Sequence, residues 1–205
     1  MQGFIIDTRI VKDEDLIVEI LTKQKVVRAY RFYGVRHSII NIGYKIDFEL
    51  ELGQKSNFAR LKEVMHLGFG WIFDNQKMFH WQKFIKLFHN HFRDVNEIDE
   101  FYFELLEECV TKIFKQNEKR VLVETYAKIL TREGRLHNDM RCFLCEEMIF
   151  GEVAPVRAFL PSHKNCSYSP TIKIEKIENF FETKSTILLD NDEVDLLWKI
   201  LLQGI

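Results

Sequence analysis

Four residues in the last third of the chain have the types and spacing of a metal site. Cys142 and Cys145 form a C-x2-C pair, and after seventeen intervening residues His163 and Cys166 form an H-x2-C pair. Two ligands separated by two residues close a tight knuckle around one ion, and two knuckles complete a tetrahedral set of ligands. Because three cysteines and one histidine leave no open coordination position, the pattern predicts a structural zinc site.

Other interpretations of these residues stay open. His137 is an alternative fourth ligand, and four coincidental residues, three of them buried thiols, are the simplest rival. Cys109 lies on an apolar helical stripe, where cysteine behaves as a small hydrophobic residue, so we expect it in the core. A deaminase-type catalytic zinc needs an H-x-E motif, and the sequence contains none.

A second segment, residues 22–37, has the composition of a nucleic-acid contact. It contains five cations and no acidic residue, and Tyr30, Phe32 and Tyr33 are interleaved among the cations. Cations neutralise phosphates, and aromatic faces stack on unpaired bases. The alternative is an ordinary amphipathic strand with solvated arginines and core aromatics, and we expect Phe32 in the core in either case. The candidate DNA-binding residues are Lys23, Lys25, Arg28, Tyr30, Arg31, Tyr33 and Arg36.

The elements around this segment predict a small β-barrel. Residues 4–11, 16–21 and 26–33 form short apolar or β-branched runs, and residues 44–52 alternate, with Tyr44, Ile46, Phe48, Leu50 and Leu52 facing one way. Residues 62–70 supply a fifth strand. Five short strands in this length favour an OB-like barrel, which we expect to form a nucleic-acid-binding domain over residues 1–72.

The rest of the chain, residues 73–205, predicts an α-helical domain with the zinc knuckle inserted at residues 137–170. Three apolar stripes at helical spacing, between residues 74 and 134, imply a small bundle. Asn96 is the expected N-cap of the second helix, and Gly134 is placed to end the third. A last amphipathic helix is expected over residues 192–202. The fold class is therefore α+β.

Composition and missing motifs narrow the function. The formal net charge is −2, so binding a polyanion needs a local basic patch. No P-loop, dinucleotide-binding glycine motif or nucleophile elbow is present, and we interpret His80, His89 and His91 as surface or satisfied side chains. No signal peptide or run long enough to span a membrane is visible. We expect a non-enzymatic protein without a small-molecule substrate.

The order of these parts resembles the RecO family of bacterial DNA-repair and recombination mediators. Residues 15–22 (DLIVEILT) resemble the second strand of that family, and residues 27–37 (VRAYRFYGVRH) its next strand, which ends in a glycine followed by basic residues. Residues 130–136 (LTREGRL), followed by residues 141–145 (RCFLC), resemble the approach to the family's zinc knuckle. His163 stands where the family usually has a fourth cysteine.

The resemblance implies an OB-fold that binds single- and double-stranded DNA, anneals complementary strands and helps RecA loading together with RecR. It also implies contact with the acidic tail of single-stranded DNA-binding protein, for which Arg132 and Arg135 are candidates by chemistry, and a bacterial, nucleoid-associated cytoplasmic location. Two alternatives are a zinc-stabilised protein-interaction module that does not bind DNA and an RNA-binding OB protein. A third is a metal-dependent hydrolase with an active site that the sequence does not display.

Overall fold

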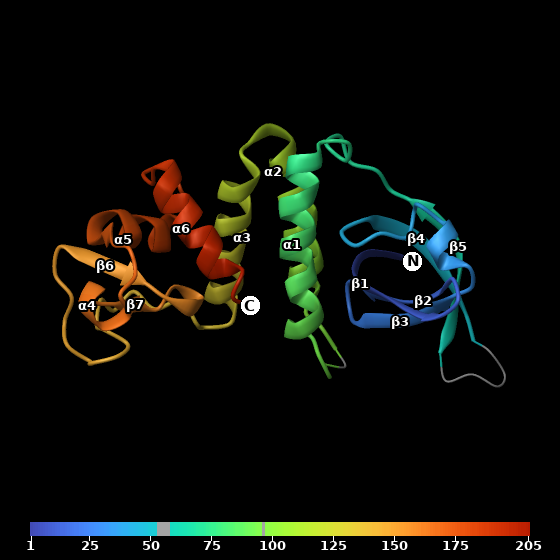
Figure 1. The fold of residues 1–205 in the computed structure, drawn as a ribbon, viewed down its shortest axis with the longest axis horizontal. Helices are drawn as coiled ribbons and strands as arrows, with labels where there is room; N and C mark the ends of the chain where they lie inside the picture. Colours follow the sequence, from blue (N-terminus) through green and yellow to red (C-terminus); the bar gives the residue numbers. More distant parts are fainter. Residues whose placement is uncertain (53–57, 96) are drawn as a thin grey trace. The chain divides into compact units, whose positions relative to one another are not determined.

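The computed structural model describes residues 1–52, 58–95 and 97–205 and divides the chain into two compact units (Figure 1). Unit 1 comprises Met1–Lys115 and unit 2 comprises Gln116–Ile205. The sequence patterns instead suggested the ranges 1–72 and 73–205. The first two helices group with the barrel because their aromatic side chains pack against it.

Five strands of unit 1 close into a barrel with the order β1-β2-β3-β5-β4. The strands are β1 (Gln2–Lys12), β2 (Asp15–Leu21), β3 (Val26–Arg31), β4 (Lys45–Glu51) and β5 (Ala59–His66). Neighbours pair antiparallel, including β1 with β4, except that β3 pairs parallel with β5. This is the five-stranded OB arrangement that the sequence predicted.

The alternating pattern of the strands builds the barrel interior. Buried aliphatic and aromatic side chains from all five strands form one core cluster, joined by Ile40 from the connection between β3 and β4. The core residues on the strands are Ile5, Leu16, Val18, Ile20, Val27, Ala29, Ile46, Phe48 and Leu61. Leu52 was predicted on the buried face of the fourth strand, but it follows the end of β4 and is 86% exposed. The fifth strand begins and ends earlier than the predicted range 62–70.

Two helices, α1 (Asn75–His91) and α2 (Glu100–Lys115), complete unit 1. Phe4 of β1 contacts Trp81 of α1 and Phe103 of α2, with ring centroids 5.9 and 5.5 Å apart. Trp81 also donates its indole N–H to the carbonyl of Gly43 at 2.8 Å. Gly43 has a φ of +86°, and a Cβ there would lie 2.8 Å from the indole ring, so glycine permits this close packing. Cys109 is buried in α2, as predicted.

Asn96, the predicted N-cap of the second helix, lies outside the described residues. Within the described chain, the side chain of Asp99 accepts a hydrogen bond from the backbone N–H of Phe101 at 3.0 Å. An aspartate just before the first helical residue satisfies an N–H that has no partner inside the helix. The start of α2 is thus capped by a residue that the pattern analysis did not single out.

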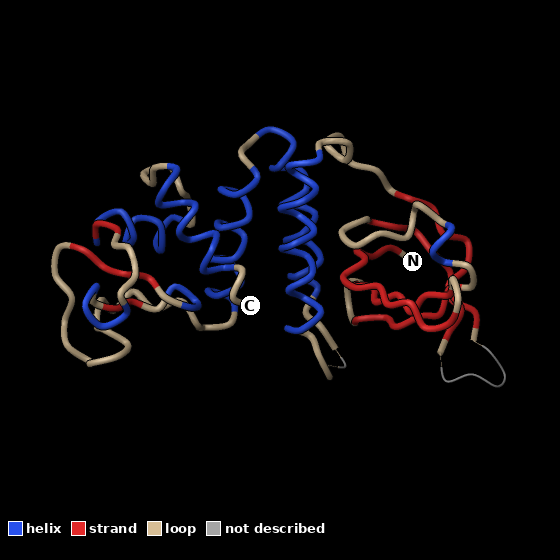
Figure 2. The backbone as a smooth tube through the Cα atoms, in the orientation of Figure 1, coloured by secondary structure: helices blue, strands red, loops and turns tan. Residues whose placement is uncertain are grey.

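Unit 2 consists of helices and three short strands (Figure 2). Its helices are α3 (Glu118–Arg132), α4 (Lys164–Ser167), α5 (Ile174–Thr183) and α6 (Asn191–Leu201). The strands β6 (Glu152–Pro155), β7 (Pro161–Ser162) and β8 (Ile172–Lys173) form a sheet in the order β7-β6-β8. Short 3-10 turns lie at Gly34–Arg36 (η1, unit 1) and Arg157–Phe159 (η2, unit 2).

The end of α3 confirms the predicted role of Gly134. This glycine has a φ of +67°, and its N–H donates to the carbonyl of Thr131 at 3.1 Å. The N–H of Arg135 donates to the carbonyl of Leu130 at 2.7 Å. Together these bonds form a Schellman motif, which fixes the direction in which the chain leaves the helix toward the cysteine pair.

Candidate metal centre and nucleic-acid interface

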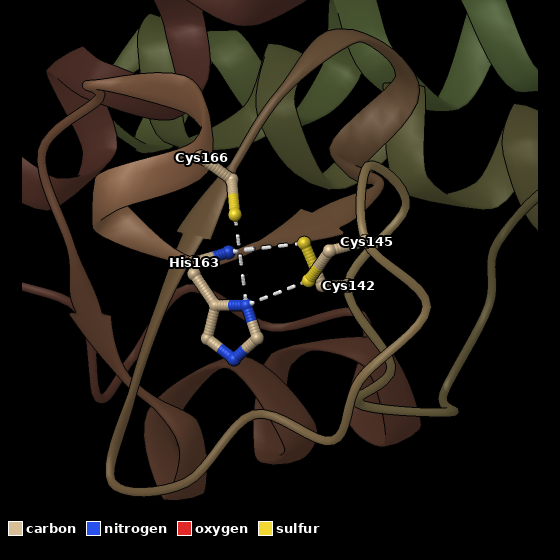
Figure 3. A group of neighbouring side chains, drawn as sticks. All are labelled: Cys142, Cys145, His163 and Cys166. Atoms are coloured by element: carbon tan, nitrogen blue, oxygen red, sulfur yellow. Dashed lines mark hydrogen bonds between the residues drawn. The ribbon is translucent and has the colours of Figure 1, made fainter.

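The four residues of the two predicted knuckles come together in unit 2 (Figure 3). Their ligand atoms all lie within 4.8 Å of one another, and we call Cys142, Cys145, His163 and Cys166 the cysteine–histidine cluster. Cys142 and Cys145 lie in the turn that follows Arg141. His163 directly follows β7, and Cys166 lies in α4. His137, the alternative fourth ligand, is exposed and is not part of this group.

The geometry of the cluster fits a tetrahedral ion. His163 Nδ1 lies 3.3 Å from Cys145 Sγ and 3.9 Å from Cys166 Sγ. Usual zinc–sulfur and zinc–nitrogen bond lengths place two tetrahedral ligand atoms about 3.6 Å apart, between these two distances. His163 Nε2 lies 3.2 Å from the carbonyl of Met148. When Nε2 carries the proton and donates to this carbonyl, the lone pair of Nδ1 faces the thiols, a common arrangement for a metal-bound histidine.

The thiols of the cluster influence one another's ionisation. Burial by itself raises the pKa of Cys142, but the backbone N–H groups of His163, Cys145 and Leu144 outweigh it and lower this pKa to about 6. Burial and the neighbouring thiols Cys145 and Cys142 raise the pKa of Cys166 to about 11. Three thiolates this close repel one another, so full ionisation of the cluster calls for a compensating cation.

The basic residues of the predicted DNA-binding segment lie in unit 1 on and around β3, and several of them are engaged in ion pairs. Arg28 donates to the largely buried carboxylate of Glu19 on β2, Nε to Oε1 at 2.8 Å. Lys23 contacts Glu100 of α2 at 2.5 Å, and the hydrogen bond raises the pKa of Lys23 above its usual value. Arg36 pairs with Glu14. Lys25 is exposed.

Arg31 has a structural role within the barrel wall. Its Nη1 donates to the carbonyl of Leu61 on β5 at 2.8 Å. Its Nε is buried and has no hydrogen-bond partner in the described chain. Arg31 therefore joins β3 to β5 near the end of their parallel pairing, and it offers a nucleic acid less free charge than an exposed arginine.

The aromatic residues of the segment gather at the end of β3. Tyr30 donates its hydroxyl to Asp15, and this hydrogen bond lowers the pKa of Asp15 and raises that of Tyr30. Tyr33 is exposed in a left-handed conformation with a φ of +51°. The prediction of a core position for Phe32 was wrong, since this side chain is 47% exposed. The strand ends at Arg31, so Phe32 lies in the turn that follows and leaves the alternating pattern.

Phe32 forms the centre of a small exposed group that sequence reasoning missed. Its ring packs edge-on against Tyr30, with centroids 4.9 Å apart, and the guanidinium of Arg60 lies 5.2 Å from its centroid. Arg36 lies over the ring of Tyr33 at 5.3 Å. Arg60 comes from β5, which the parallel pairing brings beside β3. No signal in the sequence joins residues 32 and 60, because this pairing depends on the barrel.

A cleft of about 650 Å³ lies on the outer side of the barrel, beside the end of α1. His89 of α1 reaches into it, with Nδ1 2.7 Å from Glu19 Oε2. The charged side chains around it are Asp7, Arg9, Glu19, Arg28, His89, Arg93 and Asp94. Because acidic and basic groups alternate there, the cleft has no clear preference for an anion.

An apolar groove of about 430 Å³ lies in unit 2. Its lining is Arg135, Phe143, Leu144, Val156, Arg157, Ala158, Leu160 and Gln203. Arg135, one of the two arginines considered for an acidic tail, lines this groove and pairs with Glu133 at 2.9 Å. Arg132 is exposed on the last turn of α3 and is not among the lining residues.

The fold and the site together place this protein in the class of OB-like β-barrel proteins. The barrel is followed along the chain by a helical part that contains a cysteine–histidine cluster. Residues 1–72 match the family model described as RecO N terminal, so this part of the chain is similar to the N-terminal domain of RecO proteins. No curated protein shows significant sequence similarity to the chain. Within the described residues, every helix is too short or too polar to cross a bilayer.

Proposed function

We propose that this protein is a DNA-binding recombination mediator that acts on single- and double-stranded DNA. It anneals complementary strands and assists RecA loading together with RecR, in the bacterial cytoplasm at the nucleoid. The observation that carries the proposal is the closed OB barrel with exposed cations and aromatic rings at the end of β3. In OB folds, the surface of the second and third strands is a common site for oligonucleotides.

The proposed activity needs binding energy and no catalysis. Exposed cations such as Lys25 and Arg60 would neutralise phosphates and release counterions. Two bound strands would then repel each other less, which favours annealing. The rings of Phe32 and Tyr33 offer apolar faces to unpaired bases, and stacking of this kind tolerates any sequence.

The exposure of the side chains divides the candidate residues into two groups. Lys25 and Tyr33 are exposed, and so are Lys23, Arg28 and Arg36, which also form ion pairs with Glu100, Glu19 and Glu14. Tyr30 and Arg31 are half-buried and contact Asp15 and Leu61. We assign direct DNA contact mainly to the exposed group, joined by Phe32 and Arg60.

We propose zinc as the ion of the cysteine–histidine cluster, in a structural role. Three thiols and an imidazole nitrogen are the ligands that zinc prefers, and the hydrogen bond between His163 and Met148 supports the required tautomer. The ion would hold the turn at Cys142 and Cys145 against the start of α4. It would supply no reactive position.

We propose that the apolar groove of unit 2 binds a second partner, the acidic tail of single-stranded DNA-binding protein. Phe143, Leu144 and Leu160 offer an apolar surface, and Arg135 and Arg157 add positive charge at its border. A peptide that carries both apolar side chains and carboxylates matches this combination. Docking there would bring the mediator to DNA that is already coated by its partner.

Fluorescence anisotropy of labelled DNA over a range of salt tests the DNA proposal. Replacing Lys25, Arg36 and Arg60 with alanine should weaken binding and lessen the salt slope by about one unit for each phosphate contact removed. Lys199→Ala is the matched control, because it removes an exposed positive charge from α6 in unit 2. Equal effects of the two changes would contradict an interface at the barrel.

The same assay separates the rival functions. An RNA of the same sequence that binds more tightly than DNA would favour an RNA-binding OB protein, since the 2′-hydroxyl is the only large difference. No binding to either nucleic acid at low salt would favour a protein-interaction module stabilised by zinc.

A further inference from the structure

The apolar groove of unit 2 is built on the same two segments that carry the cysteine–histidine cluster. Phe143 and Leu144, which form one wall, are the two residues between Cys142 and Cys145. Val156 and Leu160, on the opposite wall, lie at the tip of the hairpin formed by β6 and β7, whose second strand leads directly into His163. Each wall is thus joined through the chain to one ligand pair.

Two hydrogen bonds connect the walls besides the cluster itself. The N–H of Phe143 donates to the carbonyl of Pro161 at 2.8 Å. The N–H of His163 donates to Cys142 Sγ at 3.4 Å. The second bond lies among the ligand atoms of the cluster (Figure 3), and the first joins the residue after Cys142 to the residue two before His163. An ion held by the four side chains would join the two walls at the same place.

The hairpin wall is anchored independently of the cluster. Ser162 donates its hydroxyl to the carbonyl of Ala154 at 2.7 Å across the hairpin. Phe159, at its tip, is buried and packs edge-on against Tyr126 of α3, with ring centroids 5.0 Å apart. These contacts belong to the core of unit 2, so we expect the hairpin to keep its position without an ion.

The knuckle wall has much weaker support. Residues 143–148 are all exposed, and the backbone bonds of this turn are mostly internal, such as Glu146 N–H to the carbonyl of Cys142 at 2.8 Å. The isolated bridge between Arg141 and Met148 closes the turn on itself. Apart from the hydrogen bond between Phe143 and Pro161, the position of Phe143 and Leu144 relative to the hairpin therefore depends on the cluster.

From this arrangement we infer that the metal ion controls the groove: an acidic peptide with apolar side chains docks on the metal-loaded protein and is released when the ion is lost. The inference rests on the acidic-tail docking proposed above and adds its regulation. Arg135 and Arg157 lie outside the turn that carries Cys142 and Cys145, so their attraction for carboxylates persists without the ion. Loss of the metal then removes the apolar contacts that the peptide makes with Phe143 and Leu144. Only a weak, salt-sensitive attraction between the peptide carboxylates and the two arginines remains.

The test uses the full chain and a fluorescein-labelled synthetic peptide of aspartates that ends in Leu-Phe. Its affinity is measured for the zinc-loaded protein, for protein stripped with a chelator, and after zinc is restored. We expect a loss of about tenfold on stripping, within the usual range for coupled sites, and recovery with zinc. Cys145→Ala should reproduce the loss, whereas Cys109→Ala, a buried thiol of unit 1, should not.

Amide hydrogen exchange shows whether the effect is local. On stripping, the amides of Phe143 and Leu144 should exchange faster, while those of Phe159 and of Leu197 in α6 keep their protection. Loss of protection at Leu197 as well would overturn the inference, because the ion would then hold the whole unit. Leu144→Ala, which keeps every ligand, should weaken the peptide without releasing zinc.

The peptide results distinguish this inference from the proposal beneath it. Equal affinity of the loaded and stripped proteins would overturn metal control and leave acidic-tail docking intact. A peptide that binds neither form would overturn both.

Discussion

The guanidinium group of Arg28 contacts the carboxylate of Glu19 on the neighbouring strand, through Nε at 2.8 Å and Nη2 at 2.7 Å. The two residues are direct partners in the β2–β3 register. The side chain of Glu19 is 11% exposed and also meets His89 of α1, so it joins the barrel to the helix. Arg28 is thus a structural residue of unit 1 as well as a candidate contact for DNA.

Arg28→Ala should lower the free energy of unfolding by about 1–3 kcal/mol, because it leaves a buried carboxylate with a single remaining partner. Urea unfolding followed by tryptophan fluorescence measures the change. In a double-mutant cycle, adding Glu19→Gln should recover part of the loss, since the uncompensated charge is gone. Strictly additive losses would show that the pair contributes nothing.

His66 should make the stability of unit 1 depend on pH. Burial lowers the pKa of His66, and its Nε2 is buried without a hydrogen-bond partner in the described chain. When the pH falls below about 6.5, the pKa of histidine in the unfolded chain, His66 binds a proton in the unfolded chain but not in the folded protein. The contribution of neutral His66 to the free energy of unfolding is therefore fully present above about pH 6.5 and is lost as the pH falls from there toward the folded pKa.

His66→Phe keeps a ring beside Tyr44 and Phe69 but cannot titrate. The unfolding free energy of the variant should fall less than that of the parent when the pH is lowered below about 6.5. An NMR titration of the His66 ring checks the cause directly. A pKa at or above the ordinary histidine value would contradict the prediction.

Removal of the metal should affect unit 2 and spare unit 1. One zinc ion per chain is expected, released by mercurial titration of the thiols and detected with a chromophoric chelator. After chelation, the midpoint for thermal unfolding of unit 2 should fall, while salt-dependent DNA binding by the barrel stays unchanged. No bound metal, or metal that survives in both Cys145→Ala and Cys166→Ala, would refute the assignment of the cluster.

Phe32→Ala should weaken binding of single-stranded DNA by about 1–3 kcal/mol, the usual contribution of one stacked base, and should affect duplex DNA much less. Because the side chain carries no charge, the salt slope of binding should not change. Arg60→Ala, which removes the cation over the same ring, should reduce the slope by about one unit.

The control for this pair lies on α1. Phe79 is exposed and has Lys83 over its ring at 4.2 Å, so it forms a similar aromatic–cation pair at another place in unit 1. Phe79→Ala should leave both DNA affinities unchanged. Equal losses in Phe32→Ala and Phe79→Ala would indicate that exposed aromatic residues bind DNA non-specifically.

Local patterns predicted a large part of the architecture. Apolar and β-branched runs located the first three strands closely, and alternation located the fourth because the pleat repeats every two residues. The fifth strand was located less well. Gly134 ends α3 as expected, and the last helix begins within one residue of its predicted start. The short strands β6, β7 and β8 were not foreseen, since two to four residues carry too little periodicity to detect.

By itself the sequence indicated the two ligand pairs, because two ligands separated by two residues can reach one ion, and it showed the basic character of β3. It left His137 as an alternative to His163, and the tertiary structure decided between them, because the fold brings His163, which follows β7, to the three thiols. The tertiary structure also paired Lys23 with Glu100 and set Arg60 over Phe32. These contacts join residues far apart in the chain, and their geometry follows from barrel closure and helix packing, which no local pattern encodes.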